Sequence, residues 1–123
     1  MKALVKGLVV LGSVLSFSLG AAAAPLACTG TVSKVIEYAD GSVAIRSDAF
    51  SDYVYICNLK SVRSGVDTTS CAVWASQVSS VIFTSGAKVT VYYPDTTTTP
   101  TSCTSVPTYS ASPGPNYVGI GTW

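Results

Sequence analysis

Regularly spaced hydrophobic residues predict three strands in the first half of the chain beyond residue 28. The segment 29–38 is rich in β-branched and aromatic residues, and the dipeptide Asp40-Gly41 after it suits a tight hairpin turn. Ser42–Ser47 follows as a second strand, and Tyr53–Cys57 follows as a third after a polar link. In the second strand we expect two hydrophobic residues on one face, Val43 and Ile45, and smaller or polar residues on the other, Ser42, Ala44 and Arg46.

The hydrophobic residues then change to the spacing of a helix, with intervals of three and four residues. They form one stripe that consists of Cys71, Trp74, Ala75, Val78, Val81 and Ile82. This spacing predicts a helix over Cys71–Ser85, with Thr69 or Ser70 as its N-cap and a positive φ at Gly86 beyond its end. Because Trp74 lies on the stripe, we expect its ring in the core.

The remaining chain predicts two more strands, separated by a long loop. Lys88–Tyr93 alternates as a strand, and Tyr117–Trp123 suits a final edge strand that its glycines weaken. Residues 94–116 are mostly Thr, Ser and Pro, a composition that cannot build its own core, so we expect an extended loop. The chain is therefore predicted to be mainly β with one helix. Its order, three strands, a helix and two strands, is that of a five-stranded OB-fold barrel, and a small open α+β sheet with one helix is the alternative.

The first 23 residues have the features of a cleaved signal peptide. They begin with Lys2 and Lys6, continue as a mainly apolar stretch to Leu19, and end in alanines, with cleavage expected after Ala23. Residues 24–123 then form a single domain that is secreted or periplasmic, with no membrane span. A membrane anchor is one alternative, although the apolar stretch is shorter than the ~20 residues that a spanning helix needs. A lipoprotein anchored through Cys28 is another.

Charge and chemistry narrow the functional classes. Residues 24–123 carry five basic and six acidic side chains, a net charge of −1, so we expect no nucleic acid partner. The sequence has no histidine, and no motif pairs its scattered acids or activates a serine, so we expect neither an enzyme nor a metal or other cofactor. Two disulfides are expected in an exported domain from the cysteines, with three pairings open: Cys28, Cys57, Cys71 and Cys103.

Aromatic residues favour a binding role. The chain has seven tyrosines, and each offers a flat apolar ring with a hydroxyl, which suits stacking on sugars or proteins. Tyr55 and Tyr92 lie within predicted strands and are more simply explained as core residues. Tyr109 lies in the Thr/Ser/Pro-rich loop and is the stronger candidate for contact with a ligand.

Several motifs follow one another in a recognisable order. Thr29-Gly30-Thr31-Val32 comes first, and Tyr55-Ile56-Cys57 is followed after thirteen residues by Cys71 and then by Trp74. Beyond the predicted helix come Thr84-Ser85-Gly86 and Val89-Thr90-Val91-Tyr92-Tyr93. In this order and spacing the chain resembles the receptor-binding B subunits of subtilase cytotoxin and typhoid toxin. The C-terminal part of the chain, including Cys103, departs from that family.

The resemblance implies an OB-fold, a ring-shaped homopentamer, recognition of cell-surface glycans and a secreted enzymatic subunit as a partner. In that family a serine of the first strand contacts the carboxylate of the sugar, and Thr29 occupies its place with an equivalent hydroxyl. A tyrosine near the end of the helix also contacts the sugar there, whereas Ile82 and Phe83 are the nearest residues here. Thr29, Phe83 and Tyr109 are therefore the candidate ligand-binding residues.

We predict that Cys57 pairs with Cys71, the two cysteines that the resemblance matches, and that Cys28 pairs with Cys103. The first pair would join the third strand to the helix, and the second would tie the first strand to the long loop. The functional hypothesis is a secreted glycan-binding module. A monomeric periplasmic or secreted protein that contacts other proteins, as an inhibitor or an envelope component, is the alternative.

Overall fold

The computed structural model describes residues 24–95 and 99–121, and the predicted signal peptide lies outside them. Within these ranges the order of strands and helices is β1 (Leu26–Gly30), β2 (Val32–Glu37), β3 (Ser42–Ser47), β4 (Val54–Asn58), α1 (Thr68–Val81), β5 (Lys88–Tyr93) and β6 (Tyr117–Gly121). A short 3₁₀-helix, Cys103–Ser105, lies in the loop between β5 and β6. In the described part of the chain no helix is long and apolar enough to cross a membrane.

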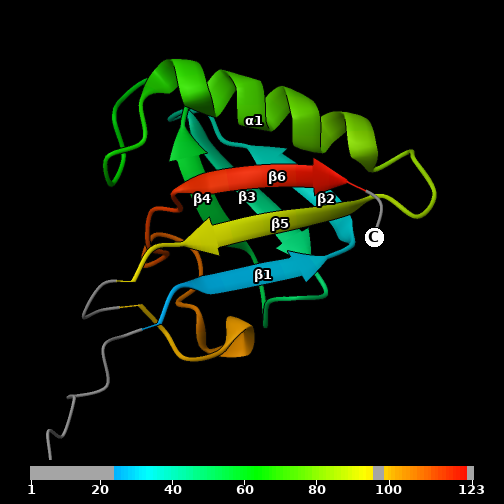
Figure 1. Cartoon of the computed structure of the whole chain (residues 1–123). Coiled ribbons are helices and arrows are strands. Elements are labelled where there is room, and N and C mark those ends of the chain that lie inside the picture. Colours follow the sequence, from blue (N-terminus) through cyan, green and yellow to red (C-terminus); the bar gives the residue numbers. More distant parts are fainter. Residues whose placement is uncertain (1–23, 96–98, 122–123) are drawn as a thin grey trace, which may run out of the picture.

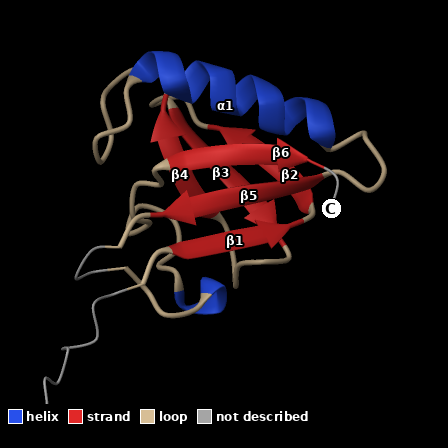
Figure 2. Ribbon diagram, in the orientation of Figure 1, coloured by secondary structure: helices blue, strands red, loops and turns tan. Residues whose placement is uncertain are grey.

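The strands form two antiparallel sheets of three strands each, in the orders β1-β5-β6 and β2-β3-β4. One sheet lies in front of the other and α1 crosses one end of both (Figure 1, Figure 2), where it contacts β2, β4 and β6. The core lies between these layers and includes Val43, Ile45, Val54, Ile56, Val78, Val89, Val91 and Tyr93. The prediction of a mainly β protein with one helix is confirmed.

The strand predicted over residues 29–38 is in fact two strands, one in each sheet. β1 pairs with β5, β2 pairs with β3, and only Thr31 separates β1 from β2. Gly30 permits this junction, because a Cβ there would collide with the side chains of Ser47, the last residue of β3, and of Asp48, which follows it. Asp48 also accepts a hydrogen bond from the Thr31 backbone N–H at 2.8 Å. Since β-branched residues continue through the junction, hydrophobic periodicity alone could not show the break.

Strand pairing among the described residues does not close the sheets into a barrel, and the arrangement is consistent with the open α+β alternative. A segment of the loop before β6 occupies the free edge of β4. The Tyr109 backbone N–H donates to the Tyr53 carbonyl at 2.9 Å, and the Tyr55 backbone N–H donates to Ser112 Oγ at 3.0 Å. Because these residues take the hydrogen-bonding groups of the β4 edge, β4 is not paired with β6.

Helix α1 begins and ends earlier than the periodicity predicts. Its N-cap is Asp67 rather than Thr69 or Ser70, because the Asp67 carboxylate accepts the Ser70 backbone N–H at 2.6 Å. Hydrogen bonds from the backbone and the side chain of Ser70 hold the pKa of Asp67 below its usual value. At the other end the helix stops at Val81, and the chain turns through residues 82–86 to Gly86, which has the predicted positive φ of 79°.

Two disulfides connect the layers: Cys28–Cys103 and Cys57–Cys71. They are the two predicted pairs. The first ties β1 to the 3₁₀-helix of the loop, and the second ties β4 to the first turn of α1. Three of the four cysteines are almost fully buried, so the disulfides belong to the core.

Candidate functional site

Thr29 lies on the exposed outer face of the sheet β1-β5-β6. It stands opposite Thr90 of β5, and the two side-chain oxygens are 2.7 Å apart, a hydrogen-bonding distance. One hydroxyl donates to the other, and because Thr90 is only 9% exposed, the Thr29 hydroxyl is the member of the pair that an outside group can reach. The residue that the resemblance selects is therefore accessible and belongs to a pair of hydroxyls.

Two tyrosines stand in the neighbouring row of the same face. Strand pairing aligns Ala27, Tyr92 and Tyr117, and the two rings stack with centroids 4.6 Å apart and an angle of 6° between their planes. Tyr117 is 45% exposed, and Tyr92 is half-buried. We call the set Thr29, Thr90, Tyr92 and Tyr117 the Thr29 surface.

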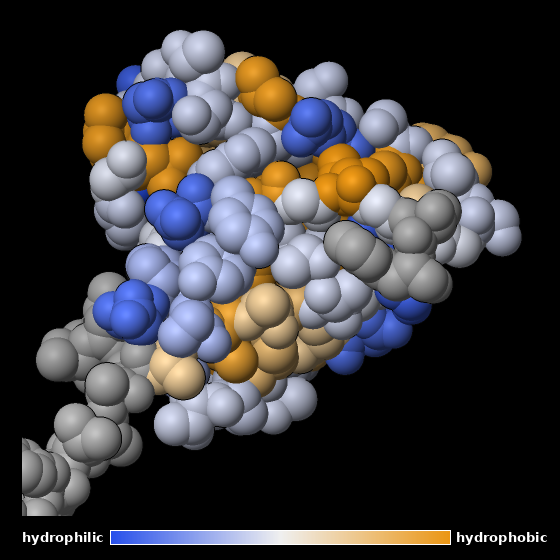
Figure 3. Space-filling model, in the orientation of Figure 1, coloured by the Kyte–Doolittle hydropathy of each residue, from blue (hydrophilic) through white to orange (hydrophobic). Residues whose placement is uncertain are grey.

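Figure 3 views this side of the molecule. Residues of intermediate hydropathy cover much of it, and strongly hydrophobic residues reach the surface in smaller areas, some of them close to α1. The Thr29 surface thus combines aromatic rings with hydroxyls and contains no charged side chain among its four members. Tyr92 is a half-buried surface residue here, whereas the sequence favoured a place in the core.

The other two candidates from the sequence lie in different surroundings. Phe83 follows the end of α1 and is 91% exposed. Tyr109 lies in the long loop with a positive φ of 54° and contacts the other sheet, where its backbone bridges to Val54 of β4. Thr29, Phe83 and Tyr109 are thus on three different parts of the fold. The sequence did not reveal that Thr90, Tyr92 and Tyr117 lie near Thr29, because their positions depend on how β1, β5 and β6 pair.

Tyr109 belongs to a second group of aromatic residues, on the outer face of the sheet β2-β3-β4. Its ring centroid is 6.1 Å from that of Tyr53 and 6.3 Å from that of Tyr55, and Tyr38 lies 5.6 Å from Tyr55. Tyr38 and Tyr109 are 36% and 41% exposed, and the other two are half-buried. We call Tyr38, Tyr53, Tyr55 and Tyr109 the tyrosine surface.

Charged groups hold the tyrosine surface in place. Asp52 accepts a hydrogen bond from the Tyr109 hydroxyl at 3.2 Å, and burial together with this carboxylate raises the pKa of Tyr109. Arg63 lies with its guanidinium carbon 5.7 Å from the Tyr55 ring centroid and donates from Nη2 to the Ser112 carbonyl at 2.8 Å. Burial lowers the pKa of Arg63, but not enough to remove its charge, so it acts as a fixed cation.

Trp74 is half-buried rather than enclosed in the core. It lines a hollow of about 280 Å³ between the start of α1 and residues 114–116, together with Ser70 and Pro94. The helix spacing correctly predicted that Trp74 packs against the core, but its ring is only partly covered at the end of the fold where it lies. Its position makes it a wall of this hollow rather than a central core residue.

Metal-binding groups do not assemble in the described residues. No three residues among His, Cys, Asp and Glu come together there in a way that could hold a metal ion, and all four cysteines are in disulfides. The side chains that gather on the surface are tyrosine rings, hydroxyls and arginines. Such groups can bind and orient a ligand through stacking and hydrogen bonds.

Comparisons of this chain with models of protein families, with curated proteins and with solved structures found no match.

Proposed function

We propose that this protein is an exported binding module that recognises glycans, with the Thr29 surface as its contact site. The observation that carries the proposal is the pair of hydroxyls, Thr29 and Thr90, next to the stacked rings of Tyr92 and Tyr117 on an open sheet face. A sugar ring has an apolar side and a rim of hydroxyls. The tyrosine rings suit the first, and the threonine pair can both donate to and accept from the second.

The proposal that the protein is exported is supported by the N-terminal sequence and by the two disulfides, which persist in oxidising compartments. A secreted or periplasmic protein meets the glycans of cell surfaces directly. A shallow site such as the Thr29 surface is expected to bind each sugar weakly, and several copies would raise the apparent affinity through multivalency.

The toxin-subunit hypothesis remains part of this proposal. The strand order, with β1 and β2 nearly continuous and α1 between β4 and β5, supports an OB-like arrangement whose barrel is opened at β4 and β6. We accordingly propose that the domain acts in a ring-shaped homo-oligomer. A secreted enzymatic subunit is the proposed partner of this ring. The alternative is a monomer that contacts proteins, and the aromatic and arginine content of the tyrosine surface favours it, since such residues dominate protein interfaces.

A glycan array with the mature domain, residues 24–123, tests the function. We expect the wild type to bind, Thr29→Ala and Tyr117→Ala each to weaken binding about tenfold, and Thr29→Ser to restore it, because serine keeps the hydroxyl. Thr69→Ala, which removes an exposed hydroxyl from α1, is the matched control and should bind like the wild type. Absence of binding by the wild type, together with a monomeric mass in solution, would favour the protein-contact alternative.

A further inference from the structure

Two cations face each other on the outer face of the sheet β2-β3-β4. Lys34 of β2 and Arg46 of β3 are directly opposite in the strand pairing, and both side chains are exposed. Like charges in this arrangement destabilise a sheet. In the described part of the chain neither cation has an ion pair with a carboxylate, so the unfavourable contact is not offset from within the protein.

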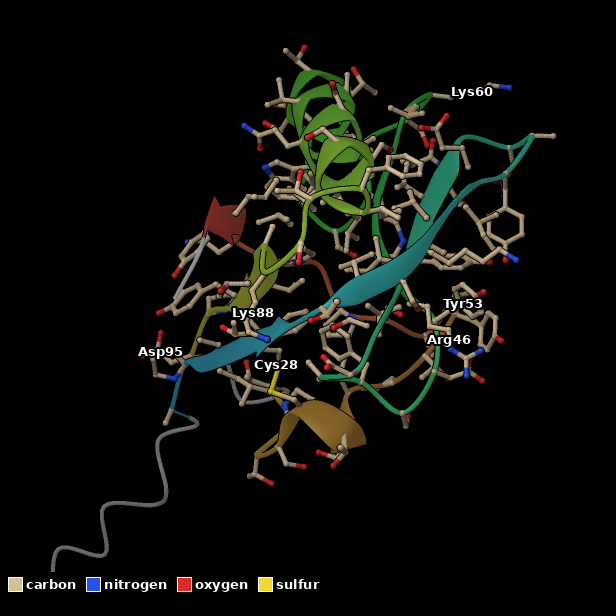
Figure 4. All side chains as sticks on the ribbon, turned by 90° about the vertical axis from the view of Figure 1, so that its right-hand side faces the viewer. Cys28, Arg46, Tyr53, Lys60, Lys88 and Asp95 are labelled. Carbon is tan, nitrogen blue, oxygen red and sulfur yellow. A yellow bond between two sulfur atoms is a disulfide. The ribbon has the colours of Figure 1, made fainter. Side chains whose placement is uncertain are left out.

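The Arg46 side chain is held by an aromatic ring. Its guanidinium carbon lies 5.6 Å from the centroid of Tyr53, within the range of a cation–π interaction. Figure 4 shows Arg46 and Tyr53 together on the side of the molecule away from Lys88. This contact orients the guanidinium without using all of its N–H donors, which remain free for an anion.

A hollow of about 370 Å³ adjoins Arg46, at the junction of β1 and β2. This volume falls within the range of small-molecule sites. Four hydroxyl residues line it, Thr31, Ser33, Ser47 and Ser51. The hydroxyls of Thr31 and Ser51 have no hydrogen-bond partner in the described residues, so they are free to contact a ligand.

Asp48 and Phe50 complete the lining of the hollow. Asp48 Oδ1 accepts the Thr31 backbone N–H at 2.8 Å, which fixes the carboxylate at one wall. A carboxylate beside free hydroxyls accepts hydrogen bonds from a polyol, whereas Arg46, which also lines the hollow and has Lys34 opposite it in the strand pairing, favours a negative group. The lining therefore matches a ligand that carries both hydroxyls and an anionic substituent.

We propose that the hollow, with Arg46, Lys34 and Tyr53, is a second saccharide site that selects a sugar with an anionic substituent. The substituent lies between Lys34 and Arg46, the sugar ring lies over the edge of Tyr53, and its hydroxyls contact Asp48, Thr31 and Ser51. A carboxylate and a sulfate ester share the required chemistry. The residues of this site differ from those of the Thr29 surface, and its cations lie on the sheet β2-β3-β4 rather than on the sheet β1-β5-β6.

Titration of the mature domain with glucuronic acid, glucose 6-sulfate and glucose, followed by NMR, tests the proposal. We expect the signals of Arg46 and Tyr53 to shift when an anionic sugar is added. At least one of the two anionic sugars should bind about tenfold more tightly than glucose. The two anionic arms distinguish a carboxylate from a sulfate source. Arg46→Gln and Lys34→Gln should each weaken the anionic sugars to the level of glucose, and added NaCl should weaken them in the wild type.

Lys60→Gln is the matched control. It makes the same change in net charge at an exposed lysine in the loop after β4, away from Arg46 in Figure 4, and should leave binding unchanged. A second readout separates a binding role from a structural one: without ligand, Lys34→Gln should not lower the thermal midpoint, because it removes a repulsion.

Equal binding of glucose and both anionic sugars, or wild-type affinity in Arg46→Gln and Lys34→Gln, would overturn the proposal. Thr29→Ala should leave this site intact. A Thr29→Ala variant that no longer binds the array but titrates normally with the anionic sugar would therefore separate the two sites. The array reports on the Thr29 surface and the titration on the hollow, so loss of binding at either site can be seen by itself.

Discussion

The outer faces of the two sheets both present tyrosines, but they are built in different ways. The Thr29 surface arises within one sheet, from side chains that strand pairing aligns in neighbouring rows. The tyrosine surface draws Tyr38, Tyr53 and Tyr55 from the sheet β2-β3-β4 and its flanks, and Tyr109 from a loop more than fifty residues later in the chain. The first surface requires a correct register, whereas the second also requires that the loop be held in place.

The two faces differ in charge as well. The four members of the Thr29 surface are uncharged, whereas Arg46, Arg63 and Asp52 all contact members of the tyrosine surface. An uncharged face of rings and hydroxyls suits neutral sugars, and a face with fixed cations can discriminate by charge. The same residue type, tyrosine, therefore supports different selectivity according to the neighbours that the fold supplies.

Removal of the disulfide between Cys28 and Cys103 should have the largest effect. It closes a loop of 75 residues in sequence separation, and the loop-entropy relation gives about 4.5 kcal/mol for its contribution to the free energy of unfolding. We expect the double variant Cys28→Ser/Cys103→Ser to disturb both surfaces, because β1 carries Thr29 and the tethered loop carries Tyr109. Denaturant unfolding measures the loss. The double variant Cys57→Ser/Cys71→Ser, with a shorter loop, should lose about 3 kcal/mol, and an equal or larger loss there would contradict the ranking.

Replacement of Arg63 should separate the two faces. Arg63→Met removes the hydrogen bond to the Ser112 carbonyl and should lower the free energy of unfolding by about 2 kcal/mol, since bonds from charged donors are among the stronger ones. We expect near-ultraviolet circular dichroism to change as Tyr109 loses its fixed position beside Tyr55. Binding at the Thr29 surface should persist, and its loss in a folded Arg63→Met variant would show that the faces are not independent.

Replacement of Thr29 should have a smaller effect on stability than on binding. Thr29→Ala removes one hydrogen bond between hydroxyls on an exposed face, so we expect the free energy of unfolding to fall by about 1 kcal/mol or less. Thermal denaturation measures this change. A loss as large as that of Arg63→Met would indicate that Thr29 supports the fold rather than a ligand site.

The smallest effect is expected at Tyr93, the inward-facing neighbour of Tyr92. Tyr93 is 1% exposed, and its hydroxyl has no hydrogen-bond partner in the described residues, so Tyr93→Phe should be neutral or slightly stabilising. Burial raises the pKa of Tyr93 well above that of an unfolded tyrosine. Below about pH 10 the Tyr93 hydroxyl is neutral in both states and does not change the free energy of unfolding with pH. As the pH rises further, the tyrosine ionises in the unfolded state first, so the free energy of unfolding falls. Denaturant midpoints above pH 10 should fall less in Tyr93→Phe than in the wild type, and equal slopes would exclude Tyr93 as the source.

Local patterns predicted several elements well. The observed strands β3 and β5 match Ser42–Ser47 and Lys88–Tyr93, and the turn at Asp40-Gly41 joins β2 to β3 with a positive φ of 93° at Gly41. Alternation and turn chemistry depend on neighbours in the sequence, so they can be read directly. The predicted start of α1 was three residues too late. Asp67, Thr69 and Ser70 can all act as N-caps, and the sequence does not show which side chain reaches the first free N–H groups.

The candidate site was predicted less completely than the fold. The place of Thr29 on an exposed face follows from its strand, but its neighbours Tyr92 and Tyr117 follow from the register of two strands that are far apart in the sequence. Tyr109 was selected for its place in a polar loop, yet its contacts arise because the loop binds the edge of β4. Neither relation leaves a periodic signal in the sequence.

The sequence by itself determined the mainly β composition and the one α-helix of the described residues, because these depend on local spacing and residue type. Only the tertiary structure decided that one predicted strand divides at Thr31, that the long loop lies against β4, and that the tyrosines separate into two outer faces. The physical reason is that a strand specifies which side chains share a face but not which strand lies beside it. That choice is made by the packing of the core and by the hydrogen bonds that remain free at each sheet edge.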